Sequence, residues 1–455
     1  MNKAIIQVYC DGKGPLRIKP KNHRDGNYSS KLHSSFGTGK LKSVIARDLL
    51  RVGQAAFLAD RAFRRGDKLG QQTRQLTVSL PVEEPKRWIG IQDYVANVAD
   101  FVSQDRWRFE FTQLRKQPHR ESWFELPRQE ASIHLFSSGL DSLCGAAAAF
   151  RRGETPIFVT HSPPGVERVM GRIRALQEII GFTKVNPLFV NFNFRASDRD
   201  AQGRRNMFPE RSRRTRPMLF LTMAGAVALE LSVPRIYLNE NGVLAINLPY
   251  QSNLHGPRIS RHAHPETLRR FEDLLRALWP FESRPSVRNP FSDLTKAEEI
   301  RYLGKARRLA EETITCEYAG QQMAILINWL KKNNRAHTKA RECGLCMPCL
   351  VRRSALEIAG VVESKGHYVF DARRAFKNPN VYRSAPLFRV VQHNPETLYK
   401  FSKRITKMKP SEFAVSFIYE LSLLPQSMVN VTETTRSAYQ LYRRFARQLS
   451  RYLAG

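Results

Sequence analysis

Residues 136–142 read Phe-Ser-Ser-Gly-Leu-Asp-Ser, and this short stretch decides the fold. It follows an apolar run at 133–136 and leads into a run of mostly small residues at 144–150. A strand that ends in a Ser/Gly turn and opens a helix forms an anion site. The first N–H groups of the helix have no partner within the helix, and its dipole end is positive. We therefore predict that this turn cradles phosphate, namely the pyrophosphate portion of ATP.

The residues of the predicted cradle contribute in different ways. Gly139 lets the backbone approach a ligand, and the hydroxyls of Ser138 and Ser142 add hydrogen-bond donors. The alternative is an ordinary strand-to-helix turn in which the serines only cap the helix. The predicted phosphate-binding residues are Ser137, Ser138, Gly139, Leu140, Asp141 and Ser142.

A second constellation is built from cysteines. The chain has six of them, and four lie close together in sequence: Cys316, Cys343, Cys346 and Cys349. Thiols at this spacing can converge on one ion in the tetrahedral S₄ arrangement that a closed, structural Zn²⁺ site prefers. We expect no secretory signal at the N-terminus, and clustered cysteines in an intracellular chain favour a metal over disulfides. A disulfide pair or free thiols are the alternatives.

Taken together, these segments resemble a known family. A Phe-Ser-x-Gly-x-Asp-Ser loop, a distant cysteine and a Cys-Gly-x-Cys-x-x-Cys run followed by arginine are similar to the 7-cyano-7-deazaguanine synthase (QueC) family of PP-loop ATP pyrophosphatases. Further matches occur in the expected order at residues 213–216, 290–298 and 313–316. The resemblance covers about residues 130–360 and implies ATP, Mg²⁺ and Zn²⁺ as cofactors.

The resemblance also implies a reaction. A substrate carboxylate attacks the α-phosphorus of ATP, pyrophosphate leaves, and an amine then displaces AMP from the acyl-adenylate. In this scheme Asp141 holds Mg²⁺ or orients the loop, while Lys296 and Arg216 neutralise the triphosphate. Arg213 is a further candidate, because arginine pairs with phosphate through two hydrogen bonds. His161 follows a predicted strand on the same sheet edge and is expected at the adenine or ribose, with a plain loop histidine as the alternative.

The sequence departs from the family in two places. Where the family carries another glycine in the loop this chain has Ser138, and the family's Tyr-Pro-Asp-Cys-Arg run is absent from residues 238–250. In its length, in the Glu-Asn-Gly segment at 240–242, in the Ile-Asn-Leu-Pro segment at 246–249 and in the His-Pro-Glu segment at 264–266, the chain is closer to the QueC-like proteins of bacterial anti-phage systems. That similarity implies a 7-deazaguanine-type substrate passed to the amine of a partner protein. The predicted substrate contacts, most of them just after a predicted strand, are Glu240, Asn241, Asn247 and His264.

Composition and charge set the wider expectations. No apolar run reaches the roughly twenty residues that a membrane-spanning helix needs, so we expect a soluble cytoplasmic protein without a membrane partner. The chain has 74 basic and 41 acidic residues and a net charge of +33. Such a charge attracts polyanions, namely nucleic acid, nucleotides or an acidic partner. A basic, solvated surface without a ligand is the alternative.

The spacing of apolar residues, which is typical of strands in some segments and of helices in others, predicts three regions. Residues 1–128 form an α+β domain. Residues 129–361 form an α/β, doubly wound parallel sheet of the adenine nucleotide alpha-hydrolase type with the zinc site, and residues 362–455 form a basic helical region. Predicted strands lie at 132–136, 156–160, 186–191 and 234–239, and predicted helices at 141–152, 166–181, 217–231, 295–309, 350–361, 396–408, 412–423 and 435–453.

Three functions fit this sequence. The first is an AMP-forming, C–N bond-forming ligase of the QueC-like type, with the 7-cyano-7-deazaguanine synthase of queuosine biosynthesis as a variant of the same chemistry. The second is a PP-loop enzyme that modifies tRNA or another RNA, which the positive charge favours. The third is a binding module in which Ser138 has disabled the loop.

Overall fold

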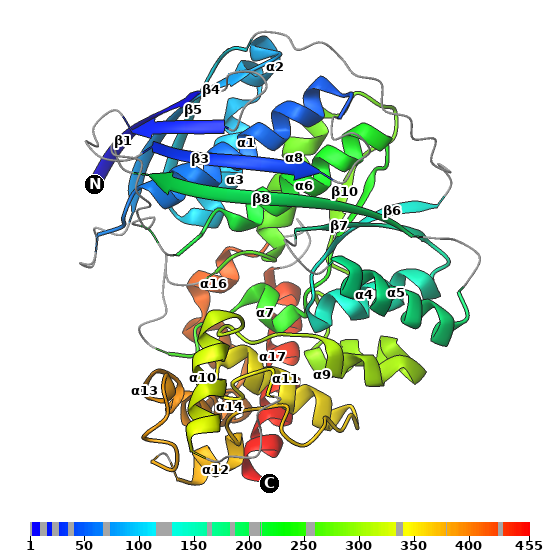
Figure 1. The fold of residues 1–455 in the computed structure, drawn as a ribbon, viewed down its shortest axis with the longest axis vertical. Coiled ribbons are helices and arrows are strands. Elements are labelled where there is room, and N and C mark those ends of the chain that lie inside the picture. Colours follow the sequence, from blue (N-terminus) through cyan, green and yellow to red (C-terminus); the bar gives the residue numbers. More distant parts are fainter. Residues whose placement is uncertain are drawn as a thin grey trace.

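The computed structural model describes residues 2–9, 16–20, 27–34, 41–66, 73–114, 130–161, 166–182, 187–199, 210, 212–251, 260–333, 340–378, 380–425 and 431–455. Its strands are β1 (Asn2–Tyr9), β2 (Leu16–Pro20), β3 (Asn27–Ser34), β4 (Arg74–Val82), β5 (Arg106–Gln113), β6 (Ala131–Phe136), β7 (Thr155–Thr160), β8 (Leu188–Arg199), β9 (Arg235–Leu238) and β10 (Ser286–Arg288). Together they form one 10-stranded sheet in the order β10-β9-β6-β7-β8-β3-β2-β1-β4-β5 (Figure 1).

The helices divide between the sheet and a separate cluster at one end of the molecule. Those near the sheet are α1 (Val44–Ala62), α2 (Pro85–Gly90), α3 (Gln92–Ser103), α4 (Leu140–Arg151), α5 (Val166–Ile180), α6 (Arg216–Leu231), α8 (Pro265–Leu278) and α9 (Lys296–Glu299), with the 3₁₀-helix η2 (Ile300–Glu312). The short helix α7 (Gly242–Ile246) follows β9 but buries Val243 and Ile246 in the core of the cluster. The cluster holds α10 (Gln321–Lys332), α11 (Met347–Ile358), α12 (Ala372–Lys377), α13 (Phe388–Val391), α14 (Asn394–Lys407), α15 (Pro410–Ser416), α16 (Ile418–Ser422) and α17 (Val431–Ala454), as Figure 1 shows.

One half of the sheet confirms the predicted α/β architecture. Strands β10, β9, β6, β7 and β8 all pair in parallel, and Ile133 at the centre is in register with Ile157 and Ile236. Helices α4 and α5 bury their apolar side chains in one hydrophobic core, while α1, α6 and α8 bury theirs in another. Apolar strands covered on both faces explain the nearly continuous hydrophobic runs of β6 and β7.

The other half of the sheet is mixed, which the sequence did not predict. Strand β8 continues to Arg199, beyond the predicted end at residue 191, and its extra length pairs antiparallel with β3 from Asn27↔Arg199 to Ser34↔Phe192. Strands β2 and β1 continue the antiparallel pairing, and β4 and β5 follow in parallel. The N-terminal strands therefore extend the same sheet, while the domain boundaries at residues 128 and 361 stay predictions.

A buried ion network ties the N-terminal helix α1 to the segment before α6. Arg74, only 1% exposed, contacts the carboxylates of Asp60 and Asp105, the latter at 2.6 Å. Asp60 Oδ2 also accepts hydrogen bonds from the Thr215 N–H (3.0 Å) and hydroxyl (3.1 Å). Burial alone would raise the pKa of Asp60, but the guanidinium groups of Arg74 and Arg65 outweigh it and lower that pKa. The network thus fixes the start of α6.

The last helix, α17, packs against both the C-terminal cluster and the sheet half. The predicted apolar stripe is buried: Ala438, Leu441, Tyr442, Phe445, Leu449 and Leu453. The Tyr442 hydroxyl donates to Val243 O (2.7 Å) and accepts from the Leu248 N–H (2.8 Å). The predicted helix at 412–423 is instead two helices, α15 and α16, that meet at Phe417. Among the described helices, none is both long and apolar enough to cross a membrane.

Candidate functional site

The turn between β6 and α4 is closed by its own hydroxyl groups. The N–H of Ser137 donates to Ser142 Oγ (3.0 Å), and the N–H of Gly139 donates to Ser137 Oγ (3.1 Å). Gly139 occupies the N-cap position of α4, and no side chain caps this helix. The serines therefore shape the turn without covering the first N–H groups of the helix, which remain open to an anion.

The turn lies where the strand order of the sheet reverses. From β6 the chain proceeds to β7 and β8 on one side, and later to β9 and β10 on the other. The carboxyl ends of β6 and β9 therefore border a crevice, which is where ligands bind in open α/β sheets. Asn241, just after β9, contacts Asp141 across it: Asn241 Nδ2 donates to Asp141 Oδ1 at 3.0 Å.

Lys296 at the start of α9 completes this junction. Its ammonium group, 2% exposed, forms an ion pair with Asp141 Oδ2 and lies 3.6 Å from Glu299. Burial would lower the pKa of Lys296, but the Asp141 carboxylate outweighs it, so the pKa is raised. Burial would likewise raise the pKa of Asp141, and the Lys296 charge lowers it instead. The pair is therefore fully ionised at neutral pH.

Two further acidic groups adjoin this ion pair. Glu299 is completely buried, and burial followed by the Asp141 charge raises its pKa well above the ordinary value. Glu240 accepts a hydrogen bond from Asn241 Nδ2 (2.8 Å), and burial and the Asp141 charge raise its pKa as well. Because Lys296 already pairs with Asp141, burial favours the uncharged form of Glu299 over a second carboxylate at this position.

A cavity of about 480 Å³ opens beside the turn, within the range of small-molecule sites. Its apolar walls include Phe136, Phe220 and Met223. The polar side chains on its walls come from four connections at the carboxyl ends of the strands. They are Ser137, Ser142, His161, Ser212, Arg213, Arg216, Asn239, Glu240, Ser260 and His262.

Two arginines give the cavity its positive charge. Arg213 and Arg216 line it, and no ion pair with either is present among the described residues. Arg216 stacks over the Phe220 ring at 5.0 Å, and burial followed by the Arg213 charge lowers its pKa. Arg213 has a φ of 50°, a conformation that non-glycine residues adopt rarely. Two unpaired guanidinium groups side by side favour an anionic ligand.

Some of the residues predicted to contact nucleotide or substrate line the cavity, and others lie outside it. His161 lies on the wall, bonded to Phe194 O at 3.2 Å, and burial lowers its pKa so that it is neutral. Asn247 ends α7 and donates to Ser260 O (3.0 Å). His264 caps α8, packs on Phe101, and has a pKa of about 3 because of burial. Of the four predicted substrate contacts, Glu240 alone is on the cavity wall.

Sequence reasoning missed several polar side chains of the cavity, among them Ser212, Ser260, His262 and Asn239, and the last two are the most informative. His262 Nε2 lies 3.1 Å from Glu240 Oε2, and nothing in its local sequence marks it as part of a site. Asn239 is 7% exposed, and neither its side-chain oxygen nor its nitrogen has a partner among the described residues. Asn239 could have been found, because it is the last residue of the strand predicted at 234–239 and stands directly before Glu240. A buried, unpaired amide on a cavity wall indicates a ligand that supplies its hydrogen bonds.

Gly145 makes room for Asn239, which gives a testable prediction. A Cβ atom at position 145 would lie 2.1 Å from the Asn239 side chain. Gly145→Ala is therefore expected to displace the amide and to lower the free energy of unfolding by about 1–3 kcal/mol through overpacking. Urea unfolding measures this. Gly171→Ala is the control, because it is also within a helix but meets no atom within 4 Å, so equal destabilisation of both variants would contradict the prediction.

The four cysteines form a compact, buried cluster in the helical end of the molecule. Their sulfur atoms all lie within 4.8 Å of one another, and the pairs Cys343–Cys349 and Cys316–Cys346 are each 3.9 Å apart. Sulfurs bonded to zinc at ~2.3 Å in a tetrahedron are about 3.8 Å apart, whereas a disulfide needs ~2.05 Å. The cluster can therefore hold one zinc ion, and the disulfide alternative is wrong for these four residues.

Backbone N–H groups support this metal geometry. Those of Leu345 and Cys346 point at Cys343 Sγ, at 3.5 and 3.3 Å, and that of Cys343 points at Cys316 Sγ at 3.4 Å. The tight turn needs Gly344, which has a φ of 89° and whose Cβ would meet Phe370 O at 2.4 Å. Hydrogen bonds from the other three thiols lower the pKa of Cys316, whereas the pKa values of Cys346 and Cys349 are raised, so the protein groups alone favour one thiolate at a time in this cluster.

A short segment connects the cysteine cluster to the phosphate turn. The Ile314 N–H donates to Ser138 O at 3.1 Å, and Cys316 is two residues further along. Glu342 accepts the N–H groups of Thr315 and Cys316, the latter at 3.1 Å. The fully buried Arg352 donates to the Thr313 hydroxyl at 2.6 Å. Residues 313–316 are therefore fixed at both ends.

We found no match to this chain among models of protein families, among curated proteins or among solved structures.

Proposed function

We propose that this protein is a PP-loop ATP pyrophosphatase of the QueC-like type, which activates a carboxylate by adenylation. One observation carries the proposal: the uncapped start of α4 lies at the reversal of the strand order, beside a cavity with two unpaired arginines. Open N–H groups, a helix dipole and guanidinium groups are the components that bind a polyphosphate. The sequence resemblance supplies the reaction class.

The residues then divide into phosphate contacts and positioning residues. The N–H groups and hydroxyls of residues 137–142 bind the β- and γ-phosphates, and Arg213 and Arg216 neutralise them. Lys296 is buried and ion-paired, so we assign it to hold Asp141 in place rather than to touch phosphate. The contacts of Asp141 with Lys296 and Asn241 likewise favour orienting the turn over binding Mg²⁺, whose site stays a prediction.

The side of the cavity that carries Glu240 suits a 7-deazaguanine carboxylate, which becomes the acyl donor. Guanine-type rings present two adjacent N–H donors, and the carboxylate of Glu240, held by His262, is an acceptor on the cavity wall. The substrate carboxylate oxygen attacks the α-phosphorus and pyrophosphate leaves. An amine nitrogen then attacks the acyl carbon, and AMP departs. Positioning and charge stabilisation supply most of the rate in such a transfer.

Two further parts of the proposal rest on the resemblance. The Cys₄ cluster is a structural zinc site, because four thiolates leave no open position for a catalytic water. The amine belongs to a partner protein of an anti-phage system.

A second candidate, a PP-loop enzyme acting on tRNA or another RNA, is favoured by the net charge of +33.

The decisive experiment combines the protein with ATP and 7-carboxy-7-deazaguanine, with ammonia or a candidate partner protein as the amine. Chromatography measures AMP, and mass spectrometry identifies a nitrile, an amide or a modified polypeptide. ATP binding without AMP release or ATP–pyrophosphate exchange would contradict the proposal and favour a binding module. Co-purified RNA with steeply salt-dependent binding would favour the RNA-modifying enzyme instead.

A further inference from the structure

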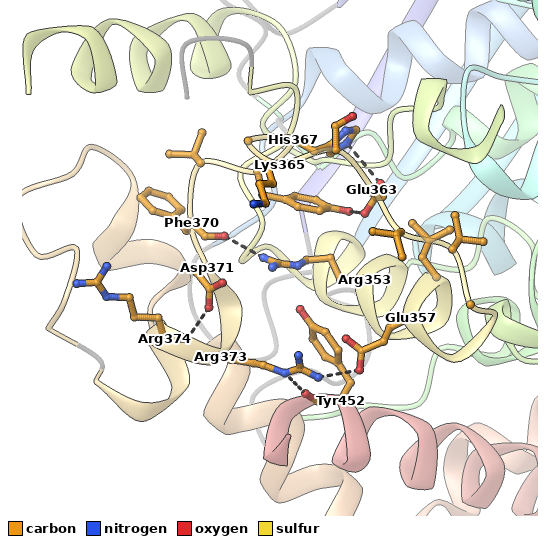
Figure 2. A pocket seen from close by; sticks show the side chains of 18 of the residues that line it. Arg353, Glu357, Glu363, Lys365, His367, Phe370, Asp371, Arg373, Arg374 and Tyr452 are labelled. Carbon is orange, nitrogen blue, oxygen red and sulfur yellow. Dashed lines mark hydrogen bonds and ion pairs between the residues drawn. The ribbon is translucent and has the colours of Figure 1, made fainter. Parts of the chain in front are cut away.

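A second cavity lies among the C-terminal helices, away from the phosphate turn (Figure 2). Its volume is about 580 Å³, and it shares no lining residue with the cavity beside β6. The end of α11, the segment 361–370, the start of α12 and the end of α17 form its walls. A cavity of this size accommodates a small organic molecule.

A buried hydroxyl group points into this cavity without a partner. Tyr452 is 3% exposed, and its hydroxyl makes no hydrogen bond among the described residues. Figure 2 shows its ring rising from α17 with the hydroxyl end toward Arg353. A buried, unsatisfied hydroxyl costs about 1–3 kcal/mol, and phenylalanine would fill the same space without that cost. The hydroxyl therefore marks a place where a ligand makes the missing bond.

The acidic groups on the walls already have partners. Glu357 pairs with Arg373 at 2.7 Å, and Glu363 pairs with the buried Arg352 at 2.8 Å. Asp371 caps α12 by accepting the Arg374 N–H at 2.7 Å. These carboxylates are held in place by the protein itself, so they do not define the ligand.

Three cationic side chains that line the cavity have no ion-pair partner among the described residues. Arg353 donates one N–H to Phe370 O (2.9 Å) and lies over the Tyr368 ring at 4.3 Å. Arg353, Lys365 and Arg374 have no ion pair with any described carboxylate. In addition, burial raises the pKa of Tyr452 to about 12, so the hydroxyl keeps its proton at neutral pH and can donate it. The cavity wall thus offers the Tyr452 hydroxyl and the Arg353 guanidinium as donors, and of its three described carboxylates only Asp371 lacks a cationic partner.

We propose that this cavity binds the phosphate group of a small phosphorylated molecule. The Tyr452 hydroxyl and those Arg353 N–H groups that bond no described residue donate to the phosphate oxygens, while the exposed Lys365 balances its charge; Arg374 points away from Tyr452 (Figure 2) and takes no part. Phosphate fits better than a carboxylate, because Arg353 and Lys365 have no ion pair with any described carboxylate and a guanidinium matches two phosphate oxygens at once. This assignment stands independently of the function proposed for the phosphate turn.

Amide hydrogen exchange of the full chain, with and without inorganic phosphate, tests the proposal and locates the binding. Phosphate is expected to slow exchange in residues 360–374. In Tyr452→Phe the phosphate concentration needed for this protection rises roughly tenfold, because a hydrogen bond to a charged group is lost. Without phosphate, Tyr452→Phe should melt no lower than the native protein.

Tyr439→Phe is the matched control on the same helix. The Tyr439 hydroxyl already donates to Met408 O (2.8 Å), so its loss should lower the melting temperature and leave phosphate protection unchanged. Protection confined to residues 137–142, or none, would overturn the proposal. So would unchanged affinity in Tyr452→Phe, a melting temperature reduced as much as in Tyr439→Phe, or equal protection by citrate.

Discussion

Asp141→Ala is expected to abolish AMP formation from ATP, with a loss of at least roughly a hundredfold, because misplacing the groups that hold the reacting phosphate by about 1 Å costs that much. The Asp141 carboxylate joins the phosphate turn to Asn241 and Lys296. Without it, the turn loses its anchor to α9, and the N–H groups no longer hold the geometry that the departing pyrophosphate needs. Chromatographic measurement of AMP reports the loss, and Asp93→Ala, an exposed carboxylate on α3, is the control.

Stability must be separated from activity in this test, because Asp141→Ala leaves the buried Lys296 ammonium without its partner. Removing one member of a buried ion pair costs about 3–5 kcal/mol, whereas replacing both with apolar residues is often neutral. Glu299, 3.6 Å from Lys296, can ionise in its place and reduce this cost. The double variant Asp141→Leu, Lys296→Met is expected to be stable and still inactive. Full AMP release by either folded variant would refute the assignment.

Loss of the metal is expected to have the second large effect. We predict one zinc per chain, and Cys346→Ser should remove it and unfold the helical end of the molecule. Zinc binding to such sites contributes about 10–16 kcal/mol, as much as the whole stability of a typical domain. Because the thiolates must be deprotonated to bind, zinc release should increase as the pH falls.

Metal analysis and thermal unfolding with and without a chelator measure these effects. Cys144→Ala is the matched control, since Cys144 is a free buried thiol of α4 that belongs to no cysteine cluster among the described residues. A native protein without zinc, or a Cys346→Ser variant that keeps it, would rule out the proposed site.

The local parts of this fold could be predicted from the sequence. Strands β6, β7 and β9 lie within a few residues of their predicted positions, because buried parallel strands leave continuous apolar runs. The cysteine spacing predicted a cluster that the structure contains. Pairing between distant segments could not be predicted. The contact of β3 with β8 depends on how far a strand extends, and no local pattern reports this.

In the candidate site, too, contacts between residues far apart in sequence could not be predicted. The partnership of Asp141 with Lys296 joins residues far apart in sequence, so only the fold reveals that Lys296 is buried and neutralised. His264 was predicted as a substrate contact, yet His-Pro-Glu at the start of α8 is also a helix-start signature, with a cap residue followed by proline. His262, two residues earlier, lies on the cavity wall, and only the path of the chain between α7 and α8 decides which histidine does so.

Residues 313–316 touch both the phosphate turn and the cysteine cluster. Ile314 is hydrogen-bonded to Ser138, and Cys316 belongs to the S₄ cluster. A displacement of the phosphate turn is therefore expected to shift the cysteine cluster, and the reverse, through this one stretch of backbone. When two binding sites are linked in this way, each ligand changes the affinity for the other by the same factor. If nucleotide and zinc bind as proposed, loading one site should change the affinity of the other by the same factor, so resistance to zinc depletion should depend on whether nucleotide is bound.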